Sequence, residues 1–380
     1  MNNKTVAIYG GTFDPPTTGH WQMIKKACDI FDELYVVVAT AHGKNPMFTE
    51  EVRQKMLEDL IPNELWLMNE TYNDPKIKIV TLPKGVFMAT FAKQIGAQFL
   101  VRGIRDEFDF HYENQIYRTN KKIEPKVETI YLMPSEEMSL VSSSWVKSLM
   151  GHYGWRQTVA PYVSPKTLAS IAFNYAKTRF LQTAKNHELD LQHPYRTWGH
   201  IESQMLDRKY HNIFHILDCI EAMELFYGAD TIMEFAFWLH DICGEEDECI
   251  SYAKSLLRHA DQETTDKVAK LIESTKHFEN QTGELDDEEQ QVFASIDLLC
   301  LGQVYKGYIE YSNNLYEEYL KKSGVSRAEF VALWKKGRSE FLEKMLSRTY
   351  IFPWKKLREN FEERARRNLE HELKVLEKMP

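Results

Sequence analysis

The sequence has few cysteines and lacks any long apolar run. The two features argue against a disulfide-bonded protein and against a membrane-spanning protein. The cysteines are Cys28, Cys219, Cys243, Cys249 and Cys300, and no two of them form a CxxC pair. This scatter is typical of free thiols in a reducing compartment and argues against a disulfide framework or a cysteine-type zinc site. No stretch approaches the ~20 apolar residues of a membrane-spanning helix. The N-terminus also lacks the apolar core of a signal peptide. We therefore expect a cytoplasmic protein.

Basic residues are also in deficit. The chain has 47 Lys and Arg against 56 Asp and Glu, for a net charge of −9. The excess of acid lies almost entirely after residue 165. This balance argues against a nucleic-acid partner and against binding to an anionic membrane. The length of 380 residues, at ~100–200 residues per domain, predicts two domains.

The first part of the chain alternates buried-type strands with amphipathic helices. Runs rich in Val, Ile and Leu are typical of strands that are covered on both faces. The alternation predicts an α/β fold with a doubly wound, Rossmann-like parallel sheet and with ligands at the carboxyl ends of the strands. We expect this domain to span residues 1–163. The predicted strands are Thr5–Tyr9, Leu34–Ala39, Ile77–Thr81, Gln98–Val101 and Thr129–Met133, and the predicted helices are His20–Phe31, Thr49–Leu60, Lys84–Ile95 and Phe108–Lys122.

Strand signals vanish after Pro165, and helical patterns with few glycines and prolines continue almost to the end of the chain. The segment Thr158–Pro165 carries two prolines and reads as the boundary. We therefore expect an all-α domain over residues 166–380, with a charged helix over Leu357–Met379.

A phosphate-binding pattern follows the first strand. Gly10 and Gly11 allow close approach of the backbone to a phosphate. A helix that begins near Gly19 directs free N–H groups and a positive dipole end to the same place. His20 stands at that helix start, where its ring can contact a phosphate oxygen. The strand, the glycine turn and the helix start together predict a nucleotide site.

This unit resembles the nucleotidyltransferase superfamily. Its (H/T)xGH signature reads Thr17–His20 here, and its second signature reads Val141–Lys147. Within the superfamily the resemblance is greatest to the bacterial phosphopantetheine adenylyltransferases, and it extends over Thr5–Pro161. Further matching blocks are Lys44–Phe48 and Leu100–Glu113.

The resemblance implies transfer of adenylyl from ATP, with Mg²⁺, to 4′-phosphopantetheine, which gives dephospho-coenzyme A and pyrophosphate. Such catalysis is mainly positioning and neutralisation of phosphate charge. It implies that His20 stabilises the charge developing on the α-phosphate, and that Thr12 and Lys44 hold the attacking phosphate. His20, Lys44 and Arg102 are the expected catalytic residues. The other implied contacts to ATP or to the acceptor are Gly11, Phe13, the Phe87–Met88 backbone, Gly103, Arg105, Glu113, Asn120, Ser142, Ser143 and Ser144.

Departures from the family pattern affect the acceptor side. Asn45 follows Lys44 where a second basic residue is usual, and Lys121 stands where Arg is commoner. The segment Leu65–Lys76 is longer than usual. Another phosphorylated acceptor, such as nicotinamide mononucleotide, therefore stays open. The resemblance also allows a homo-oligomer.

A second constellation lies in the helical part. His211 and His215 are four residues apart, which predicts that they share one helix face. His240 and Asp241 end a strongly apolar helix, Met233–Leu239. Buried polar side chains need partners, and imidazole with carboxylate suits Zn, Mn, Fe, Co or Ni. The pattern therefore predicts a transition-metal site.

The arrangement His, His-Asp, Asp resembles the HD superfamily of metal-dependent phosphohydrolases, from about Arg208 onward. The resemblance implies the ligands His211, His240, Asp241 and Asp297. It leaves His215 and His277 as extra ligands, phosphate contacts or groups that orient the ligands. Glu248 would be a general base or merely a solvated helix residue. Two readings stay open for this domain: a phosphohydrolase of unknown substrate, or a non-catalytic domain that senses a nucleotide.

Overall fold

The computed structural model describes residues 4–40, 43–61, 76–186, 188–277 and 284–378. Of the long segment Leu65–Lys76, residues 65–75 lie outside the described residues. The chain divides into two compact units, residues 1–174 and 175–380. No helix within the described ranges is long and apolar enough to cross a membrane.

The first unit is built on a five-stranded parallel sheet with the strand order β3-β2-β1-β4-β5. The order reverses direction between β1 and β4, where Ala7 pairs with Phe99. This is the doubly wound arrangement, and the prediction from the sequence is confirmed. The strands are β1 (Val6–Gly11), β2 (Glu33–Val38), β3 (Ile77–Thr81), β4 (Phe99–Gly103) and β5 (Glu128–Leu132).

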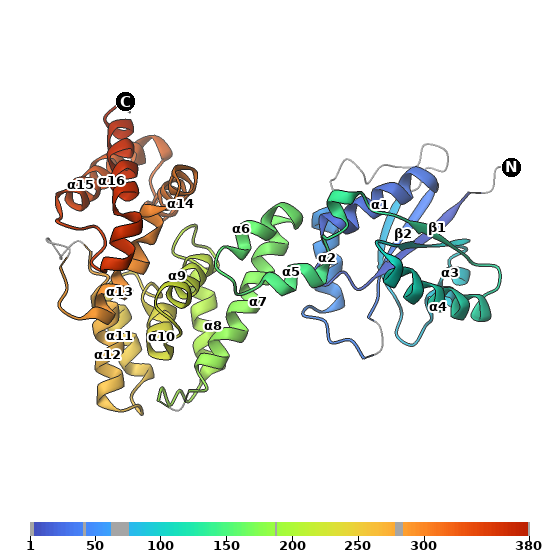
Figure 1. The fold of residues 1–380 in the computed structure, drawn as a ribbon, viewed down its shortest axis with the longest axis horizontal. Helices are drawn as coiled ribbons and strands as arrows, with labels where there is room; N and C mark the ends of the chain where they lie inside the picture. Colours follow the sequence, from blue (N-terminus) through green and yellow to red (C-terminus); the bar gives the residue numbers. More distant parts are fainter. Residues whose placement is uncertain (1–3, 41–42, 62–75, 187, 278–283, 379–380) are drawn as a thin grey trace. The chain divides into compact units, whose positions relative to one another are not determined.

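Helices cover both faces of this sheet (Figure 1). One core cluster joins strand residues to α1 and α2 side chains such as Ile24 and Leu57. The other joins the opposite strand faces to α3 through Ala92. The helix predicted over Lys84–Ile95 begins only at Met88, because Gly85 adopts a positive φ of 78° in the turn before it. The helices are α1 (Thr18–Ile30), α2 (Glu50–Leu60), α3 (Met88–Gln94), α4 (Glu107–Ile123), α5 (Ser143–Leu149) and α6 (Trp155–Val159), with short 3₁₀ turns at Glu136–Met138 and Ala160–Tyr162.

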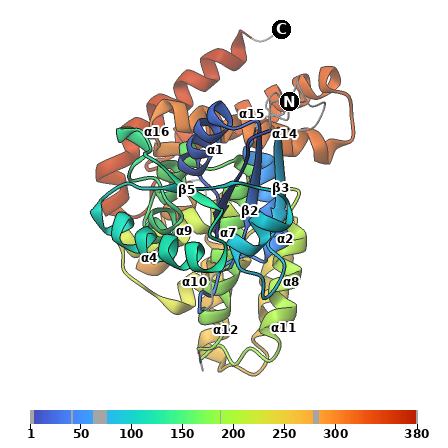
Figure 2. The same ribbon diagram turned by 90° about the vertical axis from the view of Figure 1, so that its right-hand side faces the viewer.

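The division between the units lies within α7 (Pro165–Thr183), and the second unit is mostly helical as expected. Its α11 and α12 lie side by side (Figure 2). The remaining helices are α8 (Pro194–Met205), α9 (Ile213–Phe226), α10 (Thr231–Leu239), α11 (Glu246–Leu256), α12 (Gln262–Glu273), α13 (Glu288–Asp297), α14 (Tyr305–Ser323), α15 (Arg327–Ser347) and α16 (Lys355–Glu377), with a 3₁₀ turn, η4, at Leu298–Gly302.

The core of the second unit lies around α10. Every residue of α10 from Phe235 to Leu239 is buried. Trp238 packs edge-on against Trp198 and Phe180, with ring centroids 6.2 and 5.8 Å away. Phe237 stacks on Phe293 at 4.0 Å. This apolar packing holds the end of α10, and with it His240 and Asp241, at a constant position.

Candidate functional site

A cavity of about 500 Å³ lies at the carboxyl ends of β1 and β4. This is where the strand order reverses, the usual ligand position in doubly wound sheets. The sequence-predicted residues that line it are Gly11, Thr12, Phe13, His20, Lys44, Arg102, Gly103, Arg105, Glu113, Ser142, Ser143 and Ser144. Met88 and Asn120, predicted to contact the acceptor, are not among the described residues that line the cavity.

The ring of His20 is oriented by the start of α1. Its Nδ1 accepts the backbone N–H of Thr17, the N-cap residue, at 3.0 Å. The proton of the neutral ring is therefore on Nε2, which is a donor. Burial, together with the nearby charge of Arg105, lowers the pKa of His20 to about 4. Phe13, buried and in the left-handed region at φ 51°, packs edge-on against the ring with centroids 5.1 Å apart.

Arg102 and Glu113 form a bidentate ion pair in the wall of the cavity. Nε and Nη2 of Arg102 donate to the two Glu113 oxygens at 2.6 and 2.5 Å. Nη1 donates to the Gly10 carbonyl at 2.9 Å, which ties the guanidinium to the end of β1. Arg105, which precedes the N-cap of α4, pairs with Asp109 in the first turn of that helix and is more exposed. Arg102 is thus a fixed charge, and Arg105 is a surface charge beside it.

Asp14 organises the loops around the cavity, and the sequence analysis did not single it out. Its side chain is buried and accepts the backbone N–H groups of Met47 and Phe48 at 2.9 and 3.1 Å. Lys147 donates to the same carboxylate at 2.9 Å. The buried Arg53 donates to carbonyls of the same loops, those of Phe48 and Thr12. A buried acid directly after a glycine turn is the signal that could have revealed Asp14.

The serine run lines the cavity together with His20. Ser142 is the N-cap of α5 and accepts the Trp145 N–H at 3.1 Å. Ser143 donates to the Pro15 carbonyl at 2.7 Å. Gly19 explains how the two signatures meet, because a Cβ there would lie 2.6 Å from the Val141 carbonyl oxygen. Part of the serine run is therefore structural, and the (H/T)xGH helix can approach it only through a glycine.

Comparison with known proteins agrees with this geometry. Residues 8–149 match the cytidylyltransferase-like family model. The phosphopantetheine adenylyltransferase of Neisseria meningitidis is 36% identical over 162 residues, which is 43% of this chain and 89% of the relative. That of Helicobacter hepaticus is 38% identical over 171 residues, which is 45% of this chain and 94% of the relative. The N-terminal part of the chain belongs to the phosphopantetheine adenylyltransferase family.

Every predicted transferase residue, from Gly11 to Ser144, falls inside the stretch that matches the family model. Among solved structures, a Plasmodium falciparum nicotinic acid mononucleotide adenylyltransferase complexed with NaAD is similar at 16% identity and a TM-score of 0.32. The match covers 44% of this chain and 95% of the Plasmodium falciparum chain. The adenylyltransferase-family match leaves more than half of the chain uncovered, including the helical unit.

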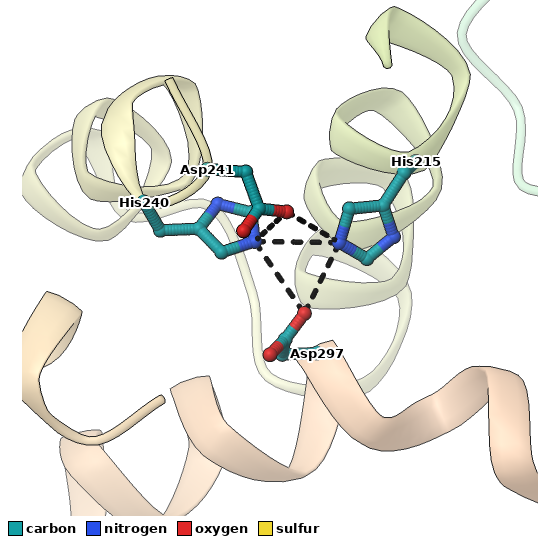
Figure 3. Close-up of side chains that lie close together, drawn as sticks. All are labelled: His215, His240, Asp241 and Asp297. Atoms are coloured by element: carbon teal, nitrogen blue, oxygen red, sulfur yellow. Dashed lines mark hydrogen bonds and ion pairs between the residues drawn. The ribbon is translucent and has the colours of Figure 1, made fainter. Parts of the chain in front are cut away.

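In the helical unit, four side chains converge from three places in the fold (Figure 3). His215 lies in α9, His240 and Asp241 follow α10, and Asp297 ends α13. Nε2 of His215 lies 3.3 Å from Nε2 of His240 and 3.1 Å from a carboxylate oxygen of Asp297. The ligand atoms of all four lie within 4.8 Å of one another. We call these four residues the polar cluster.

The donor atoms of the polar cluster suit a metal ion. His240 donates from Nδ1 to the Phe237 carbonyl at 2.9 Å, so that the lone pair of its neutral ring is on Nε2 and faces the other ligands. Oδ2 of Asp241 is buried and accepts no hydrogen bond, although it is 3.0 Å from Nε2 of His240. Burial opposes protonation of His240, but the charge of Asp241 raises its pKa well above the usual value. The cluster therefore needs positive charge, and two imidazoles with two carboxylates are a typical ligand set for a transition metal.

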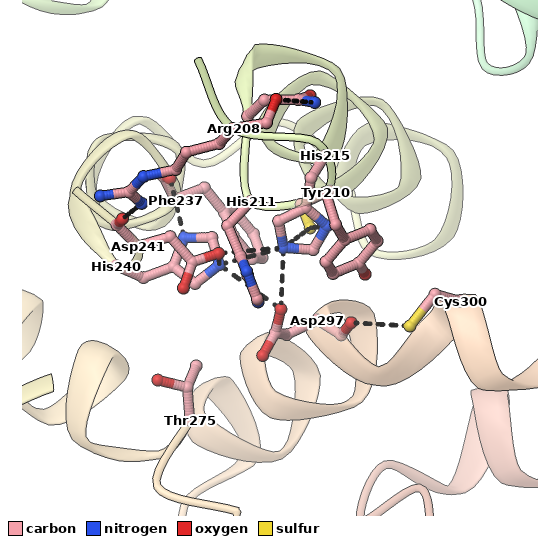
Figure 4. A network of polar contacts seen from close by, with 12 residues as sticks. Arg208, Tyr210, His211, His215, Phe237, His240, Asp241, Thr275, Asp297 and Cys300 are labelled. Atoms are coloured by element: carbon pink, nitrogen blue, oxygen red, sulfur yellow. Dashed lines mark hydrogen bonds and ion pairs between the residues drawn. The ribbon is translucent and has the colours of Figure 1, made fainter. Parts of the chain in front are cut away.

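The prediction that His211 and His215 share a helix face is wrong. Helix α9 begins only at Ile213, because Asn212 is its N-cap and accepts the Phe214 N–H. His211 lies in the preceding turn, and its Nδ1 donates to Glu318 of α14 at 2.8 Å. His211 approaches the polar cluster from the side (Figure 4). His215, predicted as an additional group, stands where His211 was expected.

The remaining predicted residues lie around the polar cluster. Nε2 of His277 is 2.9 Å from the second carboxylate oxygen of Asp297 and orients that side chain. Arg208 donates to the backbone carbonyls of Asp241 and Ile242, which holds the end of α10. Glu248 is exposed in the first turn of α11 and is not among the described residues that form the cluster. An acid there is suited to the positive end of the helix dipole.

Proposed function

We propose that the N-terminal unit transfers the adenylyl group of ATP to 4′-phosphopantetheine, which gives dephospho-coenzyme A and pyrophosphate. The observation that carries this proposal is the neutral His20 ring, whose Nε2–H is a hydrogen-bond donor in the cavity where the strand order reverses. The part of the chain that forms this cavity is similar to phosphopantetheine adenylyltransferases. Mg²⁺ bound with ATP would neutralise charge on the phosphates.

In this proposal an oxygen of the acceptor phosphate attacks the α-phosphorus, and the bond between the α-phosphorus and the bridging oxygen breaks. Pyrophosphate leaves with that oxygen. His20 donates from Nε2 to a non-bridging oxygen of the α-phosphate, where charge develops. Arg105 and Lys44 supply charge from the rim, and Arg102 keeps a fixed direction because Glu113 holds it.

The test is pyrophosphate release from ATP with a panel of acceptors. Release with 4′-phosphopantetheine supports the proposal. Release with nicotinamide mononucleotide and not with 4′-phosphopantetheine would instead identify another acceptor. The departures at Asn45 and in residues 65–76 make this comparison necessary.

For the helical unit we propose a metal-dependent phosphohydrolase. The convergence of two imidazole nitrogens and two carboxylate oxygens at the polar cluster carries this proposal. A divalent transition-metal ion held there would polarise a phosphoryl oxygen and lower the pKa of a water molecule. In hydrolysis, the water oxygen bonds to phosphorus, the phosphorus–oxygen bond to the organic group breaks, and that group leaves with a proton.

The chain's own residues have separate tasks in this reaction. His215, His240, Asp241 and Asp297 would hold the metal. Glu318 accepts the Nδ1–H of His211 at 2.8 Å, so Nε2 of that ring carries a lone pair, which would take the proton that the attacking water loses and pass it to the leaving oxygen. His277 keeps Asp297 in place through its second oxygen.

Metal analysis of the full chain tests this second proposal. We expect about one or two transition-metal ions per chain and loss of metal in Asp241→Ala. The matched control is Asp247→Ala, which removes an exposed carboxylate paired with Lys276. Metal binding without turnover of any phosphate ester would favour the nucleotide-sensing alternative. Unchanged metal content in Asp241→Ala would contradict the ligand set.

A further inference from the structure

A second cavity, of about 440 Å³, opens onto the polar cluster of the helical unit. Asp297, His211 and His277 line one side of it. The rest of the wall comes from the turn before α9, from η4, and from α14 and α15. Its aromatic members are Tyr210, Tyr311, Tyr319, Phe330, Trp334 and Phe341. The size is that of a typical small-molecule pocket. We call it the aromatic cavity.

The end of the aromatic cavity away from the cluster carries no available charge among its described lining residues. Arg338 is buried there, but its Nε and Nη2 both donate to Glu372 at 3.0 Å. Nη1 donates to the Tyr311 hydroxyl at 3.2 Å. Ser312 and Tyr308 fill the remaining positions on the Glu372 carboxylate. The guanidinium also lies 5.2 Å from the Tyr311 ring centroid. A second phosphate on a ligand would therefore have to compete with Glu372 for this guanidinium.

Gly337 leaves space in the wall. It lies within the long helix α15, is exposed and lines the cavity, and a Cβ added to it would meet no atom within 4 Å. Glycine in a helix interior destabilises the helix relative to alanine. Nothing packed against this glycine requires it to lack a side chain. Its helix-weakening presence is explained if the open space is used by a ligand.

We infer that the aromatic cavity binds the organic group of the phosphate ester that is cleaved at the polar cluster, and that this group is uncharged, flat and aromatic. This inference rests on the proposed phosphohydrolase activity. The phosphoryl group lies at the cluster, where His211 and His277 stand, and the ring lies among the aromatic side chains. Aromatic rings favour offset-stacked and edge-on contacts with another ring. Leu333 and Tyr319, which are 58% and 44% exposed, give the entrance an apolar rim.

Two sources of such a ring are a nucleobase and a simple aryl group, and binding measurements can distinguish them. The full chain, freed of metal by a chelator, is titrated by calorimetry with 2-naphthol and with adenosine. Ribose and 1-octanol are the matched probes without an aromatic ring. We expect at least one of the two aromatic compounds to bind at least about tenfold more tightly than both matched probes, as stacking on aromatic side chains predicts. Tight binding of adenosine with weak binding of 2-naphthol would indicate a nucleobase, and the reverse an aryl group.

Variants assign the binding to this cavity. Gly337→Leu places a side chain in the open space and should weaken ring binding about tenfold or more. Gly337→Ala should raise the Tm, because it improves the helix. The control is Lys336→Leu, which introduces the same residue at an exposed neighbouring position. Adenosine bound at the N-terminal cavity would not respond to Gly337→Leu. Equal binding by Gly337→Leu and the unchanged chain, or binding of 1-octanol as tight as that of the tighter-binding aromatic compound, would overturn the inference.

Hydrolysis separates this inference from the proposed function. With metal added, naphthyl phosphate or adenosine 5′-monophosphate should be cleaved at least about tenfold faster than ribose 5-phosphate. Equal cleavage of all three would retain the phosphohydrolase and reject the aromatic cavity as its specificity site. Ring binding that depends on Gly337, with no cleavage of any ester, would reject the phosphohydrolase and retain the binding site.

Discussion

Glu318 binds both the side chain and the backbone of His211. One carboxylate oxygen is 2.8 Å from Nδ1 of the ring, and the other accepts the His211 backbone N–H at 3.1 Å. The second oxygen also accepts the N–H groups of Lys209 and Tyr210, at 3.0 and 2.7 Å. One buried acid of α14 therefore fixes a turn that lies 107 residues earlier in the chain. Tyr210 and His211 both line the aromatic cavity, so Glu318 positions its wall next to the polar cluster.

Glu318→Gln should therefore uncouple the turn from α14. A glutamine has one acceptor oxygen and cannot serve both the ring and the three backbone N–H groups. Because hydrogen bonds to a charged group contribute ~1.5–3 kcal/mol each, we expect the free energy of unfolding to fall by about that much. Glu317→Gln is the matched control, since it alters an exposed ion pair with Arg327. Metal content should stay unchanged while hydrolysis falls. Loss of metal in Glu318→Gln would show that the turn supports the ligands directly.

The same carboxylate predicts a pH dependence of stability. Burial opposes ionisation of Glu318, but the hydrogen bond and charge of His211 and the backbone N–H groups lower its pKa from 4.5 to about 2. The folded state therefore binds this proton less readily than the unfolded state. The resulting stabilisation is fully present above pH 4.5 and is lost as the pH falls toward 2. Urea unfolding at several pH values between 6 and 3 gives the free energy of unfolding at each pH. This free energy should fall less steeply with falling pH in Glu318→Gln than in the unchanged chain. Identical slopes would mean that folding does not lower the pKa of this carboxyl.

His20→Ala should remove adenylyl transfer and leave the fold intact. A donor directed at developing phosphate charge contributes ~10²–10³ in kcat. Lys25→Ala, an exposed change on the same helix, is the control.

Because the pKa of His20 falls from 6.5 to about 4, the neutral ring stabilises the fold fully above pH 6.5, and this contribution is lost as the pH falls toward 4. Transfer should also show no loss near pH 6.5 from protonation of this ring. The neutral state of His20 would be contradicted if kcat fell on acidification with a midpoint at pH 6.5 in the unchanged chain and the residual kcat of His20→Ala did not.

Arg102 and Arg105 should differ in what their removal costs. Arg102→Ala leaves the buried Glu113 carboxylate without its partner, and breaking a buried pair costs ~3–5 kcal/mol, less here because Arg102 is partly exposed. Arg105→Ala breaks a surface pair with Asp109 that contributes only ~0.3–0.5 kcal/mol. We expect both variants to lose adenylyl transfer, and only Arg102→Ala to lose several degrees of Tm. Equal Tm values would show that Glu113 finds another partner or a proton.

Local signals in the sequence were sufficient for the sheet and for the transferase cavity. The strands, the glycine turn and the (H/T)xGH helix are each encoded within a few residues, and the cavity then follows from strand order. Glu318, Asp14 and Arg338 were missed for the opposite reason. Each acts on a partner far away in the chain, and an isolated acid or base in a helix or loop carries no pattern that announces it.

The error at His211 has a similar cause. Spacing of four residues predicts one helix face only if the helix includes both positions, and Asn212 begins α9 one residue too late for that. Asparagine is one of the residues preferred at the N-cap of a helix. If Asn212 is taken as the N-cap of a helix, the sequence predicts that His215, and not His211, lies on the helix that faces His240.

The two sites should also work independently. The transferase residues end at Ser144 and the polar cluster begins at His215, in different compact units. One site is a phosphate cavity at a parallel sheet and the other a set of metal ligands between helices, so the same chemical change cannot disable both. In the full chain, His20→Ala should abolish adenylyl transfer and retain metal content, and Asp241→Ala should lose metal and retain transfer. The double variant should combine the two defects. Its loss in free energy of unfolding should equal the sum of the losses of the two single variants, because distant sites are additive to within ~0.3–0.5 kcal/mol. Covalent fusion would then serve a high local concentration of a shared metabolite. If Asp241→Ala reduces kcat for transfer tenfold while the Tm of the chain is unchanged, the sites are coupled and the independence is refuted.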